Sequence, residues 1–245
     1  MGSRVRGPAG EAPHKEVNSL GGFIALAGRF LPDLLQGAGV TIEITLVCVC
    51  AGFILGWALA LGRIYGGRAL HLACTAYIEL VRGTPLLVQL FLLYFGLPDV
   101  GLVLPPVLAA GIAFGLNTAA YQAEYFRGAI QSIPASQVIA AQALGLTRFQ
   151  IIRYIVFPQA MRIVLPAWSN ELIYMLKYSS LAFALGVPEL MGRANLIASR
   201  NFRYLEVYLL AAAIYVGLVL LLSSVLGLVE RRLKVPGLAG QGRES

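Results

Sequence analysis

The stretch VYLLAAAIYVGLVLLLSSVLGLV, residues 207–229, contains no charged side chain. A hydrocarbon core about 30 Å thick needs about 20 apolar residues at a rise of about 1.5 Å each, so this stretch is long enough to cross a bilayer as a helix. It lacks the two-residue alternation of barrel strands. Because backbone groups in lipid must be satisfied within helices or closed barrels, the stretch predicts a transmembrane helix.

Four more apolar stretches accompany it along the chain. Two are free of charge and two contain charged residues: 44–62, 100–123, 69–98 around Glu79 and Arg82, and 163–188 around Glu171 and Lys177. With 58% hydrophobic residues, 13% charged residues and a mean hydropathy of +0.75, the chain has more apolar surface than a soluble domain can bury. The sequence therefore predicts an all-α integral membrane protein with about five transmembrane helices.

The predicted organisation has four parts. Residues 1–19, rich in Gly, Pro and charge, are expected to form a flexible tail, and residues 20–37 a short interfacial helix. A cleaved signal peptide is the weaker alternative, because Arg29 interrupts the apolar run and no convincing cleavage site follows. A transmembrane domain is expected over 38–230 and a basic cytoplasmic tail over 231–245. The spans are expected at about 39–62, 70–98, 102–127, 161–188 and 206–229.

The positions of Lys and Arg favour one orientation. The C-terminal group Arg231, Arg232 and Lys234 is expected to be cytoplasmic, which places the N-terminus outside if there are five spans. The loop 95–106 has no basic residue, which agrees with an outside location, although the basic residues between 193 and 203 lie on the same side. This sidedness explains the net charge of +7, and no basic helix face with interleaved aromatics suggests nucleic acid.

The sequence predicts no metal site and no nucleotide site. Cys48, Cys50 and Cys74 lie in or beside apolar segments without zinc-like spacing, and His14 and His71 are isolated. A phosphate-binding loop of the form Gly-x4-Gly-Lys-[Ser/Thr] does not occur in the sequence, so ATP is not expected to bind to this chain in that manner.

The segment 128–161, GAIQSIPASQVIAAQALGLTRFQIIRYIVFPQAM, is too polar to cross a membrane. Pro134 and Ser136 predict a helix start, and Gly145 a left-handed C-terminal cap. Thr147 is expected to cap a second short helix that ends at Pro158. The sequence thus predicts two short helices on the cytoplasmic side. From the pattern alone, a membrane-surface hairpin without a partner is equally compatible.

This segment resembles a known motif. Ala140-Ala141, Gly145, Ile155 and Phe157-Pro158 follow the spacing of the cytoplasmic coupling motif of binding-protein-dependent ABC importers, Glu-Ala-Ala-x3-Gly-x9-Ile-x-Leu-Pro. Ile139 stands where that motif has glutamate, which removes the Glu that would complete a capping box with Ser136. The resemblance implies that the hairpin 136–156 docks in a groove of an ATPase. The implied coupling residues are Ala140, Ala141, Leu144, Gly145, Phe149, Ile155 and Pro158.

The resemblance extends over about residues 31–234. Its segments are LPDLLQGAGVTIEITL (31–46), YIELVRGTPLLVQLFLLYFGLP (77–98), NTAAYQAEYFRGAIQSIP (117–134), LPAWSNELIYMLKYSSLAFALGVPEL (165–190) and FRYLEVYLLAAAIY (202–215). They are similar to the polar amino-acid permeases of the histidine, glutamine, glutamate and arginine uptake type. The resemblance implies a type I ABC importer permease fold in the bacterial inner membrane. It also implies four partners: a dimer of ATP-binding subunits that holds Mg-ATP, a second permease chain, identical or homologous, an external amino-acid-binding protein, and the polar amino acid itself. No cofactor is expected in this chain.

Polar residues within the spans are expected to mark the substrate pathway, because ionisable groups in a membrane are costly and ask for a pairing or functional explanation. Asn117, Tyr121 and Glu124 share one helix face, as do Asn170, Tyr174 and Lys177. The predicted pathway residues are Gln89, Asn117, Tyr121, Glu124, Asn170, Lys177, Ser179 and Ser180, with Glu171 as a further polar position. Structural roles remain open, such as pairing of Glu124 with Arg127 or snorkelling of Lys177. Tyr178 stands where much of the family has aspartate.

The run Arg82-Gly83-Thr84-Pro85 predicts a kink or break in its helix, with Arg82 at the cytoplasmic boundary. The kink is expected to be structural, and a gating hinge formed by Arg82, Gly83 and Pro85 is a hypothesis within that interpretation.

Two other functions remain possible. A secondary transporter would share the spans, but it would not need the hairpin, and five spans without an inverted repeat fit it poorly. A channel or scaffold subunit is a further alternative. The sequence leaves open which amino acid is carried and whether the second permease is a copy of this chain.

Overall fold

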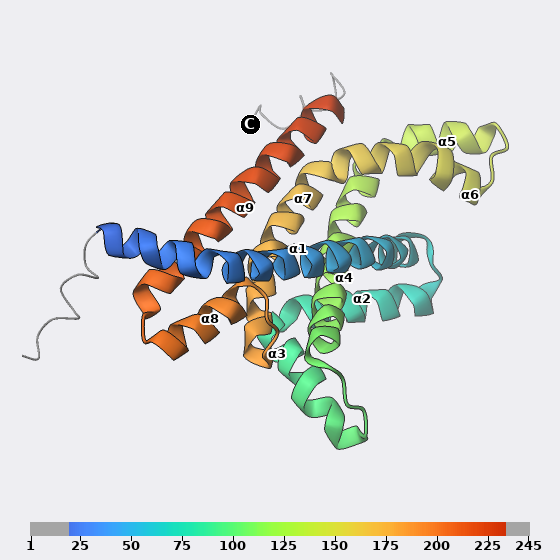
Figure 1. The fold of residues 1–245 in the computed structure, drawn as a ribbon. Helices are drawn as coiled ribbons and strands as arrows, with labels where there is room; N and C mark the ends of the chain where they lie inside the picture. Colours follow the sequence, from blue (N-terminus) through green and yellow to red (C-terminus); the bar gives the residue numbers. More distant parts are fainter. Residues whose placement is uncertain (1–19, 234–245) are drawn as a thin grey trace, which may run out of the picture.

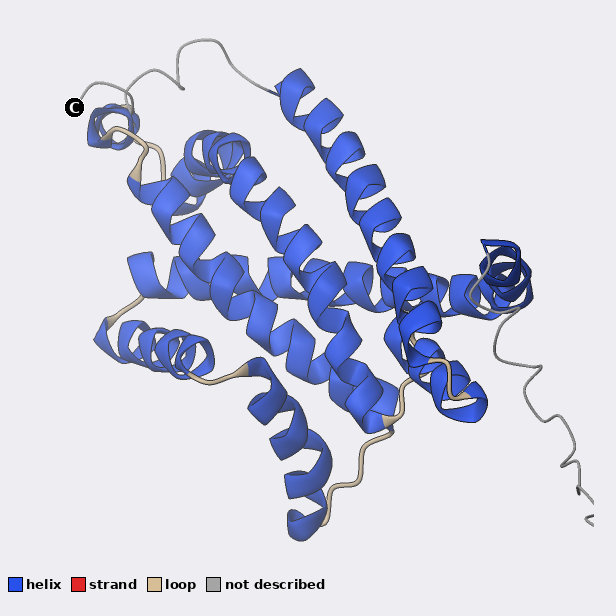
Figure 2. Ribbon diagram, turned by 90° about the vertical axis from the view of Figure 1, so that its left-hand side faces the viewer, coloured by secondary structure: helices blue, strands red, loops and turns tan. Residues whose placement is uncertain are grey.

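The computed structural model describes residues 20–233, which are helical apart from short turns and contain no strand (Figures 1 and 2). The predicted N-terminal tail, 1–19, and residues 234–245 of the predicted basic tail lie outside the described residues. The start of that tail, residues 231–233, belongs to the last helix. The all-α class predicted from the sequence is confirmed.

The first helix, α1, runs without a break over Leu20–Tyr65. At about 1.5 Å per residue its 46 residues extend over about 69 Å, more than twice the thickness of a hydrocarbon core. The predicted interfacial helix, 20–37, is thus continuous with the helix of the first predicted span. Pro32 lies inside the helix, where proline costs about 3 kcal/mol. Burial of Phe30 and Leu34 against α8 and α9 offsets this cost.

The second predicted span, 70–98, is broken in the structure. Its first part is α2, Arg68–Gly83, and its second part is α3, Leu86–Phe91, followed by a π-helical turn over Leu92–Gly96 and a 3₁₀ turn over Leu97–Val100. The two parts meet at an angle of 104°.

The cause of this break is local. Thr84 has extended backbone angles, as expected for a residue before proline, and Pro85 has no N–H to continue the helix. The Gln89 side-chain amide donates to the freed carbonyls of Val81, at 2.6 Å, and Thr84, at 3.1 Å. The predicted kink is therefore a complete helix break that a side chain stabilises.

The central helix, α4, covers Pro106–Gln131 and packs closely against α1. Gly52 and Gly56 make this approach possible. A Cβ atom at Gly56 would lie 2.9 Å from the Ala119 carbonyl oxygen and 3.1 Å from the Ala123 nitrogen, so backbone rather than a movable side chain fills the space. The two helices are thus held at a distance that only glycine permits.

Gly56→Ala is expected to destabilise the protein by about 1 to 3 kcal/mol, because the added methyl group overpacks a contact with backbone. The measurement is the thermal unfolding midpoint in detergent. Gly115→Ala is the matched control: it also lies in a helix, and a Cβ there meets nothing within 4 Å. Both variants gain about 1 kcal/mol of helix propensity. Equal midpoints for the two variants would contradict the packing argument.

Polar side chains on α4 are satisfied inside the protein. Gln122 is buried, and its amide nitrogen donates to the Val49 carbonyl oxygen and to the Thr118 hydroxyl, each at 3.1 Å. Its side-chain oxygen accepts a hydrogen bond of 3.0 Å from Trp168 on α7. Because α1 and α7 surround it, α4 tolerates polar residues that a lipid-facing helix could not.

The predicted hairpin is present as α5, Ala135–Ala143, and α6, Arg148–Ile151. Gly145 adopts φ +79°, and the N–H groups of Gly145 and Leu146 donate to the carbonyls of Gln142 and Ala141. This pattern is a Schellman motif, and the predicted glycine cap is confirmed. Thr147 forms a capping box with Gln150, which confirms the second predicted cap.

The end of the hairpin differs from the prediction. A π-helical turn, Ile152–Val156, joins α6 to α7, Phe157–Tyr178, so Pro158 does not end the second helix. Pro158 has no N–H to donate back into the preceding turn, and the helix accommodates it next to the π-helical turn and continues as α7. The first helix starts at Ala135 with Pro134 as its N-cap residue, and the Ser136 hydroxyl does not cap it.

After α7 the chain forms a 3₁₀ segment, Ser179–Leu185, and then α8, Leu190–Asn201, and α9, Tyr204–Leu233. The buried Glu189 carboxylate caps α8 by accepting from the N–H groups of Met191 and Gly192, at 2.8 and 2.7 Å. It also accepts from Thr41 on α1 and Tyr215 on α9, at 3.3 and 3.1 Å. One carboxylate thus joins three helices.

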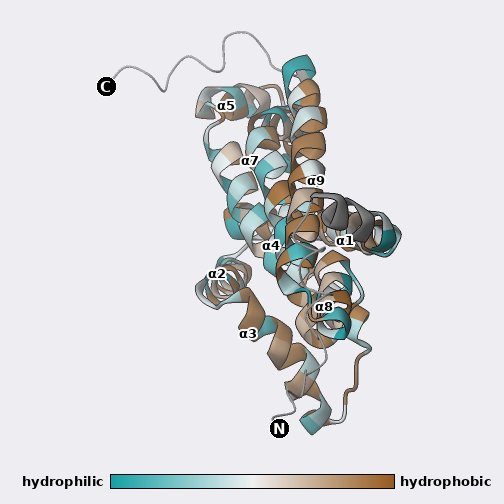
Figure 3. Cartoon of the chain, turned by 60° about the vertical axis from the view of Figure 1, so that its left-hand side comes forward, coloured by the Kyte–Doolittle hydropathy of each residue, from teal (hydrophilic) through white to brown (hydrophobic). Residues whose placement is uncertain are grey.

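The predicted spans correspond to helices of different kinds. Among the described residues, α1 and α9 are each long and apolar enough to cross a membrane singly. Two bent pairs of helices are long and apolar enough only when each pair is counted as one span. One pair is α2 with α3. The other joins the segment Arg148–Leu185 to α8, with a bend of 47°. The remaining predicted span, 102–127, corresponds to α4, whose polar residues keep it out of this set. In Figure 3 α3 and α9 are mostly hydrophobic, whereas α7 is mixed.

Candidate functional site

A cavity of about 570 Å³ opens where the break between α2 and α3 faces α4 and α7. Its volume lies in the range of small-molecule sites. The walls consist of the break, a row of tyrosines and a few polar side chains: Arg82, Gly83, Thr84, Pro85, Leu86, Leu87, Asn117, Tyr121, Tyr125, Glu171, Tyr174, Tyr178 and Leu181. The cavity thus brings the predicted hinge residues together with Asn117 and Tyr121 from the predicted pathway.

Gln89 does not line this cavity itself but binds two residues that do, Asn117 and Thr84. Its side-chain oxygen accepts a hydrogen bond of 3.1 Å from Asn117, and its nitrogen also donates to the Thr84 hydroxyl at 2.8 Å. Gln89 therefore holds Asn117 in place and fixes the helix break at the same time. Asn117 is buried apart from the edge that lines the cavity.

Glu171 on α7 is the acidic group of the cavity. It is 5% exposed, and its carboxylate accepts hydrogen bonds from the Thr118 hydroxyl at 2.6 Å and the Tyr125 hydroxyl at 3.2 Å. Within the described part of the chain, no Lys or Arg nitrogen lies within 4 Å of it. The carboxylate is therefore held by neutral donors alone.

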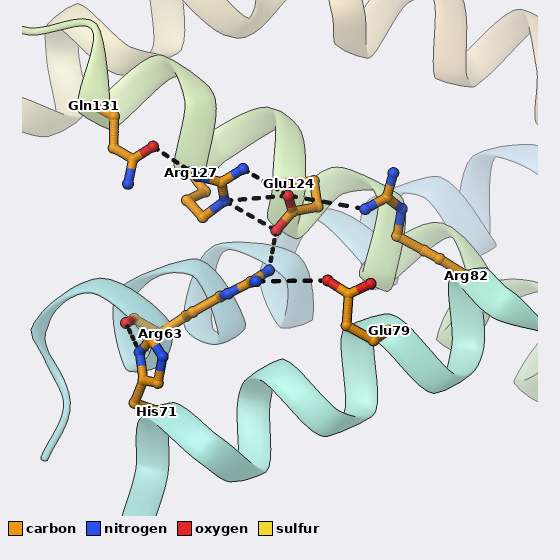
Figure 4. Close-up of polar contacts among 7 residues, drawn as sticks. All are labelled: Arg63, His71, Glu79, Arg82, Glu124, Arg127 and Gln131. Atoms are coloured by element: carbon orange, nitrogen blue, oxygen red, sulfur yellow. Dashed lines mark hydrogen bonds and ion pairs between the residues drawn. The ribbon is translucent and has the colours of Figure 1, made fainter. Parts of the chain in front are cut away.

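Glu124 lies one turn beyond Tyr121, outside the cavity lining, at the centre of an ion-pair cluster (Figure 4). Arg127 binds it through Nε, 3.1 Å from both oxygens, and Nη2, 2.8 Å from Oε2. Arg63 on α1 donates to Oε1. The alternative that Glu124 pairs with Arg127 is therefore realised, and the cluster also links α1 to α4.

Arg82 connects this cluster to the cavity. Its Nη1 lies 3.8 Å from Oε2 of Glu124, and its guanidinium stacks over the Tyr121 ring at 5.3 Å. Arg63 has a second partner in Glu79 on α2, at 3.5 Å, and His71 donates to the Arg63 carbonyl oxygen. The cluster therefore fixes α2 against α1 and α4 at one end of the cavity.

Besides Gln89 and Glu124, four more predicted pathway residues lie outside the cavity lining: Asn170, Lys177, Ser179 and Ser180. Asn170 and Lys177 are exposed on α7, and the Lys177 ammonium lies 4.7 Å from the centre of the Tyr174 ring. Ser179 and Ser180 donate to carbonyls of their own helix, at Leu176 and Lys177. In this structure these side chains do not meet Gln89, Asn117 or Tyr121.

The hairpin offers a second candidate site, an apolar surface at one end of the molecule. Leu144 and Phe149 are 81% and 75% exposed and Ala140 and Pro158 are exposed. Ala141, predicted to contact an ATPase, is only 3% exposed and packs with Ile151 and Val156 inside the chain. The most exposed large apolar side chains of the hairpin are therefore Leu144 and Phe149, and Ile139 and Tyr154 are exposed as well.

Some residues of the site were missed in the sequence. Thr118 and Tyr125 bind Glu171, and Arg63 binds Glu124. Tyr125 follows Tyr121 by one helical turn, so helical spacing could have placed it on the same face as the predicted pathway residues. Arg63 lies 61 positions from Glu124, and only the packing of α1 on α4 brings the two together.

Comparison with known proteins gives a consistent result. Residues 52–235 match the family described as binding-protein-dependent transport system inner membrane component. A probable amino-acid ABC transporter permease, YckA of Bacillus subtilis strain 168, is 43% identical over 190 residues, covering 78% of this chain and 84% of the relative. The glutamine transport system permease GlnP of Escherichia coli K12 is 37% identical over 207 residues, covering 84% and 94%.

A solved structure is similar as well. A crystal structure of an amino acid ABC transporter with histidines has a TM-score of 0.80 and 38% identity, and the match covers 86% of this chain and 98% of that one.

Proposed function

Because the chain belongs to the family of binding-protein-dependent transport system inner membrane components and has the fold of a type I ABC importer permease, we propose that it imports polar amino acids delivered by an external binding protein. The cavity at the helix break carries this proposal. It combines an acidic group, a guanidinium and several hydroxyls, which are the groups that an amino acid requires. The names of the relatives, which include amino-acid and glutamine permeases, support the same substrate class.

ATP hydrolysis is proposed to occur in a separate pair of ATP-binding subunits that hold Mg-ATP, with no cofactor in this chain. The exposed Leu144 and Phe149 support the hairpin as their docking surface, since an amphipathic helix binds a groove through such apolar knobs. ATP-driven closure of these subunits would switch the permease between inward-open and outward-open states as a rigid-body movement.

The proposed arrangement in the membrane follows the hairpin. Figure 1 shows α5 and α6 at the same end of the molecule as the C-terminal end of α9, with α3 at the opposite end. The proposal places the hairpin and the C-terminus in the cytoplasm and the N-terminus outside. A second permease chain, identical or homologous, would complete the pathway. Movement at Gly83 and Pro85 stays a prediction, which alanine at both positions would test through the uptake rate.

Uptake into vesicles tests the function. The chain is purified from its own host with its copurifying subunits and reconstituted with the binding protein. We expect ATP-dependent accumulation of at least one of glutamine, histidine, arginine and glutamate, and no accumulation without ATP. The same assay without the ATP-binding subunits is the control. Accumulation driven by an ion gradient in the absence of ATP would indicate a secondary transporter instead.

A further inference from the structure

An apolar groove of about 640 Å³ lies on the surface between α1 and α4, apart from the cavity at the helix break. Large aliphatic side chains of both helices form most of its walls: Ile44, Val47 and Leu55 of α1, and Leu108, Ile112 and Leu116 of α4. Among the described residues that line the groove, Glu43 alone is charged. So apolar a surface is filled either by lipid or by another chain.

The groove exists because α1 and α4 separate from each other toward the start of α4. Their contact is close at Gly56, where a Cβ atom would lie 2.9 Å from the Ala119 carbonyl oxygen. Gly111 and Gly115 precede this contact on α4 and line the groove, and a Cβ atom at either would meet nothing within 4 Å. The two glycines therefore leave space between the helices that no side chain of this chain fills.

The ion pair between Arg63 and Glu124 locates the groove across the membrane, because charged clusters avoid the bilayer interior. Glu43 lies 20 positions before Arg63 on α1, which is about 30 Å of helix and about the thickness of the hydrocarbon core. Pro105 lies 19 positions before Glu124, a distance of about 28 Å. Both helices thus place the end of the groove that contains Glu43 and Pro105 among the headgroups of the opposite leaflet.

The dimensions of the groove suit an acyl chain better than a helix. On α4 the lining runs from Val107 to Leu116, about 14 Å, which is close to half of a hydrocarbon core of about 30 Å. A helix about 10 Å across would occupy about 1,100 Å³ over this length. The groove offers about 640 Å³. The lipid tail of a single leaflet therefore fits, whereas a helix of a second subunit does not.

Glu43 supplies a preference for the headgroup. Its side chain is exposed, and within the described part of the chain no Lys or Arg nitrogen lies within 4 Å of it. Lipid tails are as apolar as the groove, so the tail alone does not favour one lipid over another. A carboxylate at the headgroup level attracts an ammonium group and repels an anionic headgroup. A primary ammonium adds three N–H donors, which makes the contact a charge-assisted hydrogen bond.

From the groove and its single charge we propose that the surface between α1 and α4 is a lipid site. It takes one acyl chain of a zwitterionic lipid of the phosphatidylethanolamine class, with the primary ammonium of the headgroup on the Glu43 carboxylate. In the arrangement proposed above, this lipid belongs to the outer leaflet. The site is separate from the cavity at the helix break and does not depend on which solute the protein carries.

Photocrosslinking in vesicles tests this assignment. The permease–ATPase complex is reconstituted in phosphatidylcholine with a trace of phosphatidylethanolamine or phosphatidylglycerol that carries a diazirine in the middle of one acyl chain. Peptide mass spectrometry then measures labelling of residues 105–116. We expect phosphatidylethanolamine to label this segment at least fivefold more than phosphatidylglycerol, because only the former carries the ammonium.

Glu43→Gln removes the charge and keeps the shape of the side chain. It is expected to reduce the preference for phosphatidylethanolamine to less than twofold, while labelling by both lipids continues because the groove remains open. Asp33→Asn is the matched control, since it removes an exposed carboxylate of the same helix outside the groove. It should keep the fivefold preference.

Gly111→Leu fills the groove itself. It is expected to reduce labelling of residues 105–116 at least fivefold with either lipid, since the new side chain occupies the space of the tail. Gly217→Leu is the control, because it adds the same side chain at an exposed position of α9 where a Cβ atom meets nothing within 4 Å. It should label residues 105–116 as the unchanged chain does.

Two results would overturn the inference. Equal labelling by the two lipids in the unchanged chain, or a preference that survives Glu43→Gln, would show that Glu43 does not select the headgroup. Labelling of α9 without any labelling of residues 105–116 would show that another protein chain covers the groove. Neither result would bear on the proposed transport function, which the uptake assay tests separately.

Discussion

Leu144→Asp combined with Phe149→Asp is expected to abolish ATP-dependent uptake by separating the chain from its ATP-binding subunits. Both side chains are largely exposed in this chain, and complete burial of each in a partner groove contributes about 1.5 to 3 kcal/mol. The double variant should therefore bind the ATPase at least hundredfold more weakly. Copurification of the ATPase and uptake in vesicles are the two measurements.

The matched control for this variant lies at the other end of the molecule. Phe202 is 82% exposed at the turn between α8 and α9, so Phe202→Asp changes surface polarity equally without touching the hairpin. It should copurify the ATPase at the normal level. If the hairpin variant still retains the ATPase and transports normally, the hairpin is not the coupling surface. Ala141→Arg is less informative, because Ala141 is buried in the hairpin and the change would disturb its packing.

Glu124→Ala is expected to destabilise the protein by about 3 to 5 kcal/mol, because it leaves buried positive charge without its partner. The Glu124 side chain is 14% exposed and that of Arg63 is 17% exposed. Arg127 can turn to Gln131, which it already contacts at 2.6 Å. Among the described residues Arg63 keeps one acidic partner, Glu79, whose side chain is largely exposed. The thermal unfolding midpoint and the yield of folded protein in detergent measure the effect.

Glu79→Ala provides the comparison within the same cluster. The Glu79 side chain is 61% exposed and lies 3.5 Å from Arg63, so its ion pair is screened by solvent and should contribute at most about 1 kcal/mol. If Glu79→Ala and Glu124→Ala lower the midpoint equally, the cluster is not organised around Glu124.

The sequence predicted the helices and caps that depend on neighbouring residues along the chain. It did not predict the features that depend on contacts between helices. Residues 206–229 became part of α9, and the caps at Gly145 and Thr147 appeared where their side chains and backbone angles require them. Residues 20–37 are continuous with the first predicted span, and α8 packs against α1 on both sides of residue 38. Pro158 did not end its helix, because the preceding π-helical turn changes the register of backbone bonds.

The site was predicted only in part for a related reason. Helical spacing grouped Asn117 with Tyr121 correctly, since both line the cavity. The same spacing placed Lys177 with Asn170, yet periodicity does not say which neighbour a face meets, and this face is exposed in the single chain. Ser179 starts a 3₁₀ segment, so the spacing of residues around an α-helix no longer predicts which side chains share a face beyond it. Contacts between distant segments, such as Arg63 with Glu124, leave no local pattern.

The helix α9 has few packing partners of its own. Only 11% of the most apolar stretch of α9 is buried within the chain, whereas 39% of the corresponding stretch of α1 is buried. Lipid rewards hydrophobicity and length but not the shape of a particular side chain, so exchanges among leucine, isoleucine and valine on its exposed positions should leave this chain intact. Any strict requirement for individual residues there would have to come from another subunit. Scanning that helix for intolerant positions would therefore map a neighbour rather than a core.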